Sequence, residues 1–277
     1  MSRLTEPIPC PLDAMQPIGL DDMKAVRLMN RMDRKYIAPA ARLDELLSLI
    51  ADGYFVQHID GNPLAPYHTL YFDTDDLRMY TMHHNRKLNR QKLRVRCYRS
   101  TDTTFFEIKN KDNKKKTRKV RIPISPELFD DALSVPDVAT FITQNTPYLV
   151  PTAENALAPN RLHPCLENNF ERITLVDKGM SERITIDRNI TFHNRATGLS
   201  ADISPILVIE VKHEVGAPQS DIERALHAMH ILPRRMSKYC IGTALTDPQA
   251  KRNRFKPKLL AIDKIIRYET SAKRLRP

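Results

Sequence analysis

The sequence has no tryptophan, only seven glycines, and aromatic residues make up just 6% of its 277 positions. Proteins that bind single-stranded nucleic acid stack bases on exposed aromatic side chains among basic residues, so this composition argues against that class. The four cysteines, Cys10, Cys97, Cys165 and Cys240, lie far apart and lack the spacing of a zinc site or a dense disulfide framework. We therefore predict reduced thiols in a cytoplasmic protein that binds no specific nucleic acid.

Long apolar runs are also missing. The longest uncharged aliphatic run, about residues 205–209, is far shorter than the roughly 20 residues that a membrane-spanning helix needs. Residues 1–19 contain four prolines and no apolar core, which is not the pattern of a signal peptide. We interpret them as a Pro-rich lead-in to the folded domain.

Basic charge is abundant but unevenly placed. Of the net charge of +11, residues 251–277 contribute +8, with ten Lys and Arg against two acids. The rest of the chain carries only +3, so global charge does not by itself indicate an anion site. Leu259, Ile262 and Ile266 form an apolar stripe at helical spacing, and this tail could pack on its own domain, bind product, or lie against an anionic membrane or a membrane partner. We predict a main domain over residues 20–247 and a basic tail over 248–277.

The most informative pattern is a period-two alternation of charged and aliphatic residues in six segments. These segments are Leu93–Arg96, Phe106–Lys109, Lys119–Ile122, Arg172–Leu175, Arg183–Asp187 and Ile209–Lys212. Successive side chains of a strand point to opposite faces, so the sheet has one apolar face and one face biased to Arg and Lys. Because like charges on one face repel each other, the bias predicts a concave sheet or barrel whose interior binds phosphate groups.

The pattern predicts an α+β fold, an eight-stranded antiparallel tunnel or barrel with a basic interior and flanking helices. The predicted strands cover residues 68–73, 91–99, 103–111, 117–124, 171–176, 182–187, 206–213 and 238–244. Helices are expected at 20–30, 39–52, 74–84 and 219–230, with two short ones between 126 and 145. Residues 146–163 contain three prolines and are expected to cross over without regular structure.

The charged segments stand in an order that resembles the VTC-type polyphosphate polymerase domain, a branch of the CYTH/triphosphate tunnel metalloenzyme superfamily. The ordered motifs are Arg34–Tyr36, Tyr71–Thr74, Lys92–Tyr98, Phe106–Lys109, Lys119–Arg121, Glu171–Arg172, Glu182–Asp187, Ile209–Lys212 and Ser237–Tyr239. Each motif alone is weak, but the ordered set is specific and extends from about residue 20 to 245. The resemblance implies a basic tunnel in which the γ-phosphate of ATP is transferred to a growing inorganic polyphosphate chain, with Mn²⁺ or Mg²⁺.

The resemblance also implies roles for particular residues. Those expected to act in catalysis are Arg94, Arg96, Lys109 and Lys238. Those expected to bind phosphate are Lys35, Lys119, Arg121, Arg172, Arg183 and Lys212. Glu210 would bind the metal ion, with Glu107 as a second acid. Arg offers phosphate a bidentate fork and Lys a point charge, and a hard divalent ion takes carboxylate and phosphate oxygens.

Other functions stay open. Tunnel enzymes that hydrolyse inorganic triphosphate or RNA 5′-triphosphates carry denser glutamate rows, often Glu-x-Glu-x-Lys, and this sequence has no such motif. A non-catalytic polyphosphate-binding module is the further alternative. The expected ligands are ATP and polyphosphate, and export of product would need a separate membrane protein, so association with a membrane through that partner or the basic tail is a further expectation. The Lys114–Lys116 run could steer ATP at a tunnel mouth.

Overall fold

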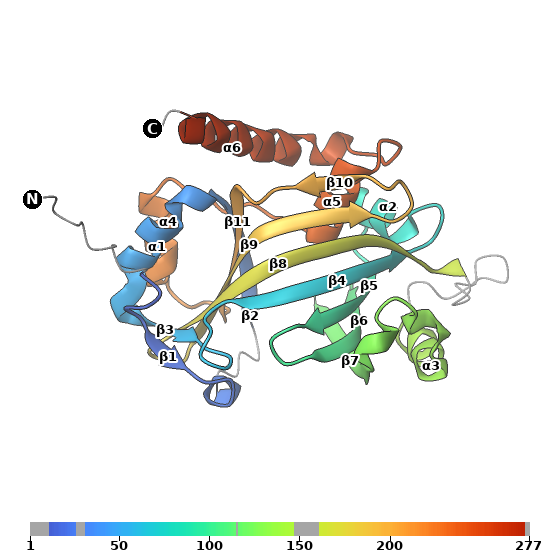
Figure 1. The fold of residues 1–277 in the computed structure, drawn as a ribbon, viewed down its shortest axis with the longest axis horizontal. Coiled ribbons are helices and arrows are strands. Elements are labelled where there is room, and N and C mark those ends of the chain that lie inside the picture. The colour runs from blue at the N-terminus through green and yellow to red at the C-terminus, as the bar shows by residue number, and fades with distance from the viewer. Residues whose placement is uncertain (1–10, 26–30, 115, 147–160, 275–277) are drawn as a thin grey trace, which may run out of the picture.

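The computed structural model describes residues 11–25, 31–114, 116–146 and 161–274, and one large sheet organises them (Figure 1). Its main path runs β2-β11-β9-β8-β4-β5-β6-β7, with every neighbouring pair antiparallel. These strands are β2 (Arg31–Pro39), β4 (Ala65–Asp73), β5 (Arg90–Tyr98), β6 (Thr103–Lys111), β7 (Thr117–Ile124), β8 (His163–Asp177), β9 (Glu182–Asn194) and β11 (Ile206–Glu214). Three short strands, β1 (Gln16–Ile18), β3 (Tyr54–Gln57) and β10 (Ser200–Asp202), extend the sheet at its sides.

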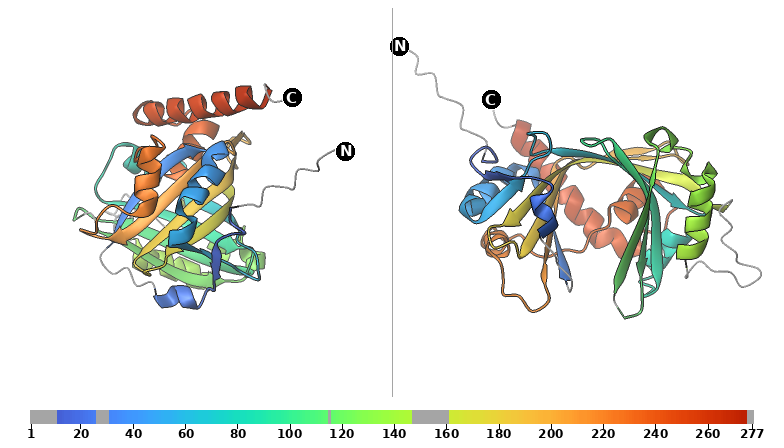
Figure 2. Two further views of the ribbon diagram at one scale, coloured as in Figure 1. Left: turned by 90° about the vertical axis from the view of Figure 1, so that its left-hand side faces the viewer. Right: turned by 90° about the horizontal axis from the view of Figure 1, so that it is seen from below.

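The sheet bends into a trough (Figure 2), with β2 and β11 on one wall and β5, β6 and β7 on the other. The predicted antiparallel α+β fold is confirmed, but closure into a barrel is wrong, because the edge strands β2 and β7 do not pair in the described ranges. The segment before α5 (Lys238–Thr246) covers the edge of β2 instead. Pro233 bridges to Tyr36, and the Arg234 amide donates to the carbonyl oxygen of Lys35 at 2.6 Å.

The predicted strand at residues 238–244 is a helix, α5 (Lys238–Thr246), and β2 takes its place as the eighth strand of the path. The apolar run at residues 238–244 is compatible with a buried helix as well as with a buried strand. The side chain of Ser237 caps the helix by accepting from the Cys240 amide at 3.4 Å. Gly242 lets the helix lie close to the sheet, since a Cβ there would stand 2.5 Å from Phe192 Cδ1 and 2.7 Å from Leu166 Cδ2.

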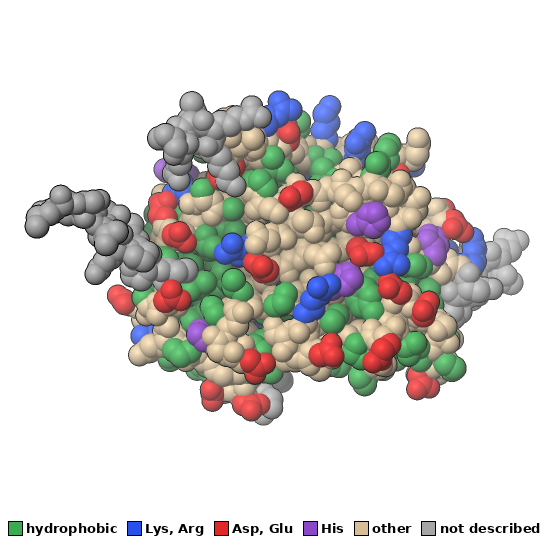
Figure 3. Space-filling view, viewed as in Figure 1, with side chains coloured by type: hydrophobic (Ala, Val, Ile, Leu, Met, Phe, Trp, Pro, Cys, Tyr) green, Lys and Arg blue, Asp and Glu red, His purple; other side chains and the backbone are tan. Residues whose placement is uncertain are grey.

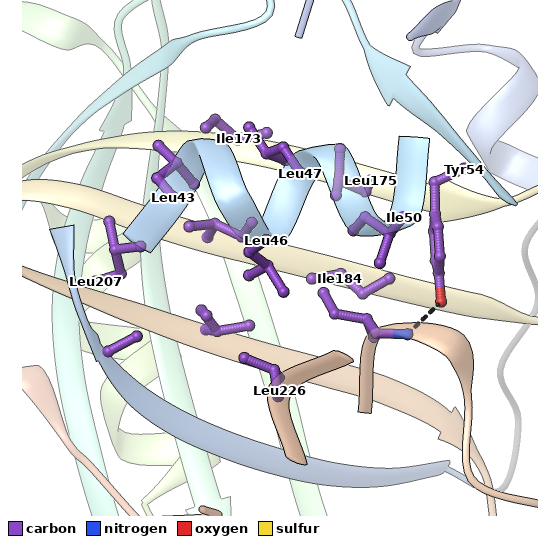
Figure 4. Packing of buried hydrophobic residues seen from close by; sticks show 14 of the residues in the cluster. Leu43, Leu46, Leu47, Ile50, Tyr54, Ile173, Leu175, Ile184, Leu207 and Leu226 are labelled. Atoms are coloured by element: carbon purple, nitrogen blue, oxygen red, sulfur yellow. Dashed lines mark hydrogen bonds between the residues drawn. The ribbon is translucent and has the colours of Figure 1, made fainter. Parts of the chain in front are cut away.

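Helices bury the apolar face of the sheet. Leu43, Leu46, Leu47 and Ile50 of α1 (Leu43–Ile50) pack with α4 (Asp221–Ala228) against β8, β9 and β11 (Figure 4). The hydroxyl of Tyr54 accepts from the Ile222 amide at 3.2 Å and ties the start of α4 to β3. On the other wall, α3 (Pro136–Asn145) covers the apolar face of β5 and β6, and α2 (Arg78–His84) follows β4. The charged face is thereby left to the inside of the trough.

The remaining helix predictions differ in detail. The predicted helix at 20–30 appears as a 3₁₀ turn at Asp22–Ala25, and residues 26–30 lie outside the described part of the chain. The predicted crossing at 146–163 falls mostly on residues that are not described, and β8 begins at its last position. The basic tail forms α6 (Lys256–Arg274), whose Ile262 is buried in a core shared with α5. No helix of the described ranges is long and apolar enough to span a membrane.

Candidate phosphate-binding trough

The strand register places the charged residues on one face of the sheet. Directly opposed residues on neighbouring strands share a face, and one such row runs Arg121, Glu107, Arg94 and Tyr71 across β7, β6, β5 and β4. The predicted strand residues that lie on this face are Lys35, Arg94, Arg96, Glu107, Lys109, Lys119, Arg121, Arg172, Arg183, Glu210 and Lys212. The outer side of β4, β8 and β9 carries only scattered Lys and Arg, and more of them gather along α6 (Figure 3).

Lys238 joins the same face although its segment is a helix. It is the first residue of α5, and its ammonium lies 4.3 Å from the ring centroid of Phe170 on β8. The helix thus delivers to the trough the side chain that the sequence assigned to a strand. Although the strand predicted at residues 238–244 is a helix, Lys238 still lies inside the site.

Three carboxylates of the charged face are each held between two cations. The pairs are Arg94 and Lys119 on Glu107, Arg172 and Lys238 on Asp187, and Lys35 and Lys212 on Glu210. The arginines bind with two nitrogens: Nε and Nη2 of Arg172 lie 2.6 and 2.9 Å from the two oxygens of Asp187. Sequence reasoning assigned no role to Asp187, although its spacing from Arg183 places it on this face.

These interior carboxylates stay ionised. Burial alone would raise their pKa values, but the paired cations outweigh it and hold the pKa of Glu107, Asp187 and Glu210 well below the usual range. The side chain of Glu107 is only 1% exposed, against 15% for Glu210. Glu107 is therefore closed off by its partners, whereas Glu210 remains partly open to the trough.

Loss of hydration in the trough lowers the pKa of five lysines to about 8, and neighbouring cations add to this effect. These five interior lysines, which face the inside of the trough, are Lys92, Lys109, Lys119, Lys212 and Lys238, and of these Lys109 and Lys119 remain exposed to solvent. The charge of Lys35 on one wall lowers the pKa values of Lys109 and Lys92 on the other wall, so the two walls interact electrostatically. Each of the five is mostly charged at pH 7 and loses its proton within the range of ordinary buffers.

Lys92 is a site residue that the sequence-based assignment omitted. It stands two positions before Arg94 on the same strand and therefore on the same face. Its Nζ donates to the Ser237 hydroxyl at 2.7 Å, which links β5 to the start of α5. The alternation that revealed Arg94 and Arg96 would have found it.

Aromatic rings on the trough floor hold the arginines in place. The guanidinium of Arg96 lies 5.4 Å from the ring centroid of Tyr67 and 5.8 Å from that of Phe170, and Arg172 contacts the same two rings. The Nε of Arg96 donates to the Thr69 hydroxyl at 3.2 Å. No ion pair with a carboxylate forms at Arg96 or Lys109 within the described residues. Both are therefore ready to take an anionic ligand.

A cavity of about 270 Å³ opens between the two walls. Its lining includes Lys35 from β2, Lys92 from β5, Lys109 from β6 and Ser237 before α5. The cavity is thus bounded by groups from both walls and by the helix that replaces a strand. A linear anion placed here would meet cations on several sides.

A divalent ion fits the trough only together with phosphate. In the described ranges, no group of three or more His, Cys, Asp and Glu side chains could hold a metal ion on its own. Mg²⁺ and similar ions bind through one or two carboxylates plus substrate phosphate oxygens. Glu210 suits that arrangement because it is partly open, but both its oxygens accept from lysines, Lys35 and Lys212. Glu107 fits less well, because its carboxylate is closed off.

Comparison with protein families finds the VTC domain over residues 30–246. A candidate adenylate cyclase from Bacillus halodurans is 15% identical, with 75% of this chain and 94% of that chain covered and a TM-score of 0.46. A candidate adenylyl cyclase from Hippeastrum, described as having a dominant triphosphatase activity, is 13% identical, with 79% and 97% covered and a TM-score of 0.45. An RNA triphosphatase of Schizosaccharomyces pombe is 10% identical, with 83% and 88% covered and a TM-score of 0.28. Comparison with curated proteins gives no match.

Proposed function

Because the chain belongs to the VTC domain family, we propose that it transfers the γ-phosphate of ATP to the end of an inorganic polyphosphate chain. The observation that carries the proposal is the charged face of the trough. Cations from both walls and from α5 converge there, outnumber the carboxylates and are held in place by rings and ion pairs. Phosphoryl transfer needs little covalent chemistry from a protein beyond such positioning and charge stabilisation.

Binding of the substrate would exchange one set of ion pairs for another. Without phosphate, the carboxylates Glu107, Asp187 and Glu210 offset part of the cationic charge and keep the buried cations paired. Phosphate oxygens offer the same cations bidentate and charge-assisted hydrogen bonds. Arg96 and Lys109 would bind first, since no carboxylate holds them, and the paired cations would follow.

The chemical step is a direct displacement. An oxygen of the terminal phosphate of the chain attacks the γ-phosphorus of ATP, and the bond from that phosphorus to the oxygen bridging the β-phosphate breaks. ADP leaves with the electron pair of that bond, and the chain is longer by one phosphate. The attacking oxygen is already ionised, so the protein needs no Ser, Cys or His nucleophile. Arg94, Arg96, Lys109 and Lys238 would stabilise the charge that spreads over the transferred group.

Mn²⁺ or Mg²⁺, when bound, would neutralise phosphate charge beside the transferred group. Glu210 would hold it through its partly open carboxylate, with phosphate oxygens as further ligands. Lys35 and Lys212 would then move from Glu210 to phosphate. The proposed metal site is therefore completed by the substrate.

The test is to incubate the purified protein with ATP and Mn²⁺ and to resolve the products on a polyacrylamide gel stained for polyphosphate. A ladder of products with matching release of ADP is expected. Arg96→Ala should abolish the ladder without leaving a carboxylate unpaired, since Arg96 forms no ion pair with a carboxylate among the described residues and is held by Thr69 and aromatic rings. Arg42→Ala, which changes an exposed ion pair with Glu45 outside the trough, should leave the ladder unchanged.

The same gel separates the alternative functions. Release of free phosphate without a ladder would identify a triphosphatase and refute the proposed polymerase. No turnover, together with tight binding of added polyphosphate, would identify a polyphosphate receptor. We further propose a cytoplasmic location and export of the product through a membrane partner.

A further inference from the structure

The charged face continues past the centre of the trough toward α6. Arg90 at the start of β5 is directly opposed to Lys111 at the end of β6, so both side chains share the face of the trough. Both also line the cavity between the walls, together with Arg235 from the loop before α5 and Lys258 from α6. Four cations from four separate segments thus extend the site at this end.

The extended face is longer than a triphosphate needs. Along β5 the cations Arg90, Lys92, Arg94 and Arg96 alternate on one side, and six residues of strand span about 20 Å. A triphosphate has only two bridging oxygens and spans much less. The row of cations therefore matches a linear polyanion with more than three phosphate units.

The lining of the cavity favours a phosphate chain over a nucleoside at this end. Its apolar members Met236, Ile241 and Phe255 are only 7%, 1% and 5% exposed, so they offer little surface on which a base could stack. Among the described residues, Asp33 is the one carboxylate in the lining. The ligand that the cavity accepts is therefore predominantly anionic.

His83 adds a buried polar group to the same cavity. Its Nδ1 has no hydrogen-bond partner in the described part of the chain, and its ring faces Phe255 at 6.3 Å between centroids. Burial and the charges of Lys92, Arg90, Lys258 and Lys111 lower the pKa of His83 to about 2. A neutral imidazole keeps an N–H donor for a phosphate oxygen. The group is thus placed to bind an anion without adding charge.

We propose that this end of the cavity binds the units of inorganic polyphosphate beyond the three nearest the trough centre, with Lys258 as a further phosphate-binding residue. Lys258 belongs to α6, which lies wholly beyond the residues 30–246 that match the VTC domain. The proposal rests on the proposed function only in taking the ligand to be a phosphate chain. The basic tail then forms one wall of the site and selects for chain length.

The test measures binding without turnover, by calorimetric titration of the full chain with inorganic triphosphate and with a long linear polyphosphate. Lys258→Ala is expected to weaken binding of the long chain by about three- to ten-fold and to change triphosphate binding by less than about two-fold. Lys264→Ala, at an exposed position of the same helix, is the matched control and should change neither. Lys258→Glu should enlarge the loss for the long chain, and Arg235→Ala should reproduce the loss from another segment.

The outcomes separate this inference from the proposed function. Equal effects of Lys258→Ala and Lys264→Ala would overturn the inference even if the wild-type protein makes polyphosphate. An equal loss for triphosphate and the long chain would also overturn it, since Lys258 would then act at the trough centre. A selective loss for the long chain would support it even if ATP gives no ladder.

Discussion

Replacing Glu210 by Gln should have opposite effects on phosphate affinity with and without metal. In the free protein Glu210 accepts from Lys35 and Lys212, so it competes with phosphate for both ammonium groups. An ammonium that bridges a carboxylate and a phosphate holds the two anions about 7 Å apart, which corresponds to about 2 kcal/mol of repulsion at an effective dielectric constant of 20. Glu210→Gln should therefore bind inorganic triphosphate about 30-fold more tightly when a chelator removes divalent ions.

With Mn²⁺ present, Glu210→Gln should no longer bind triphosphate more tightly than the wild-type protein. The wild-type protein gains the ion as a bridge between Glu210 and phosphate, whereas the amide is a poor ligand for a hard divalent ion. Calorimetric titration with triphosphate, in chelator and then in Mn²⁺, measures both affinities. Glu45→Gln is the matched control, because Glu45 pairs with Arg42 on the exposed surface.

Thermal unfolding tests the same pairings independently. In the ligand-free Glu210→Gln protein, Lys35 and Lys212 lie close together without a carboxylate between them. The melting temperature of this variant should therefore be lower than that of the wild-type protein. Saturating triphosphate should restore most of the loss, because phosphate takes over both lysines. Unchanged or weaker triphosphate binding in chelator would refute the view that Glu210 competes with phosphate.

Further predictions concern pH and packing. Triphosphate affinity should fall between pH 7 and pH 9.5, because the five interior lysines have pKa values near 8 and lose their charges in this range; titrations at both pH values test this, and a flat profile would contradict it. The contribution of these lysines to the free energy of unfolding should increase with pH between pH 8 and about 10.4. Their pKa values are lowered on folding, so the unfolded chain binds more protons than the folded protein in this range. Denaturation at several pH values measures the trend. Gly242→Ala should destabilise the fold by about 1–3 kcal/mol in chemical denaturation, because its Cβ would overlap Phe192 and Leu166, whereas Gly53→Ala, with only Asp221 Oδ2 at 3.4 Å, should cost less.

The hairpin strands could be predicted from the sequence because one face of each is apolar and the connections are short. The predicted bounds 103–111 and 117–124 coincide with β6 and β7. In these strands charged and aliphatic side chains alternate over residues 107–109 and 119–122, and a buried face fixes the register. The charged face of the trough follows from the same alternation.

The strand β2 escaped prediction because it carries charge on both faces. Lys35 points into the trough, while Arg34 on the opposite face donates to Glu223 of α4 at 3.0 Å. A local pattern cannot reveal a charge that is paired with a residue far away in the sequence. The pairing of each interior carboxylate with two cations was hidden for the same reason, since it depends on register and on side chains from several elements.

The gap between β2 and β7 bears on how a polymer gets into the site. A closed barrel admits a long chain only end first, so any block at the chain terminus prevents loading. Because these two edges do not pair in the described residues, we expect a chain to enter sideways along the part of the trough that the segment before α5 leaves uncovered. Polyphosphate with both ends capped, or joined into a ring, should therefore still compete for the trough, although a capped end cannot be extended.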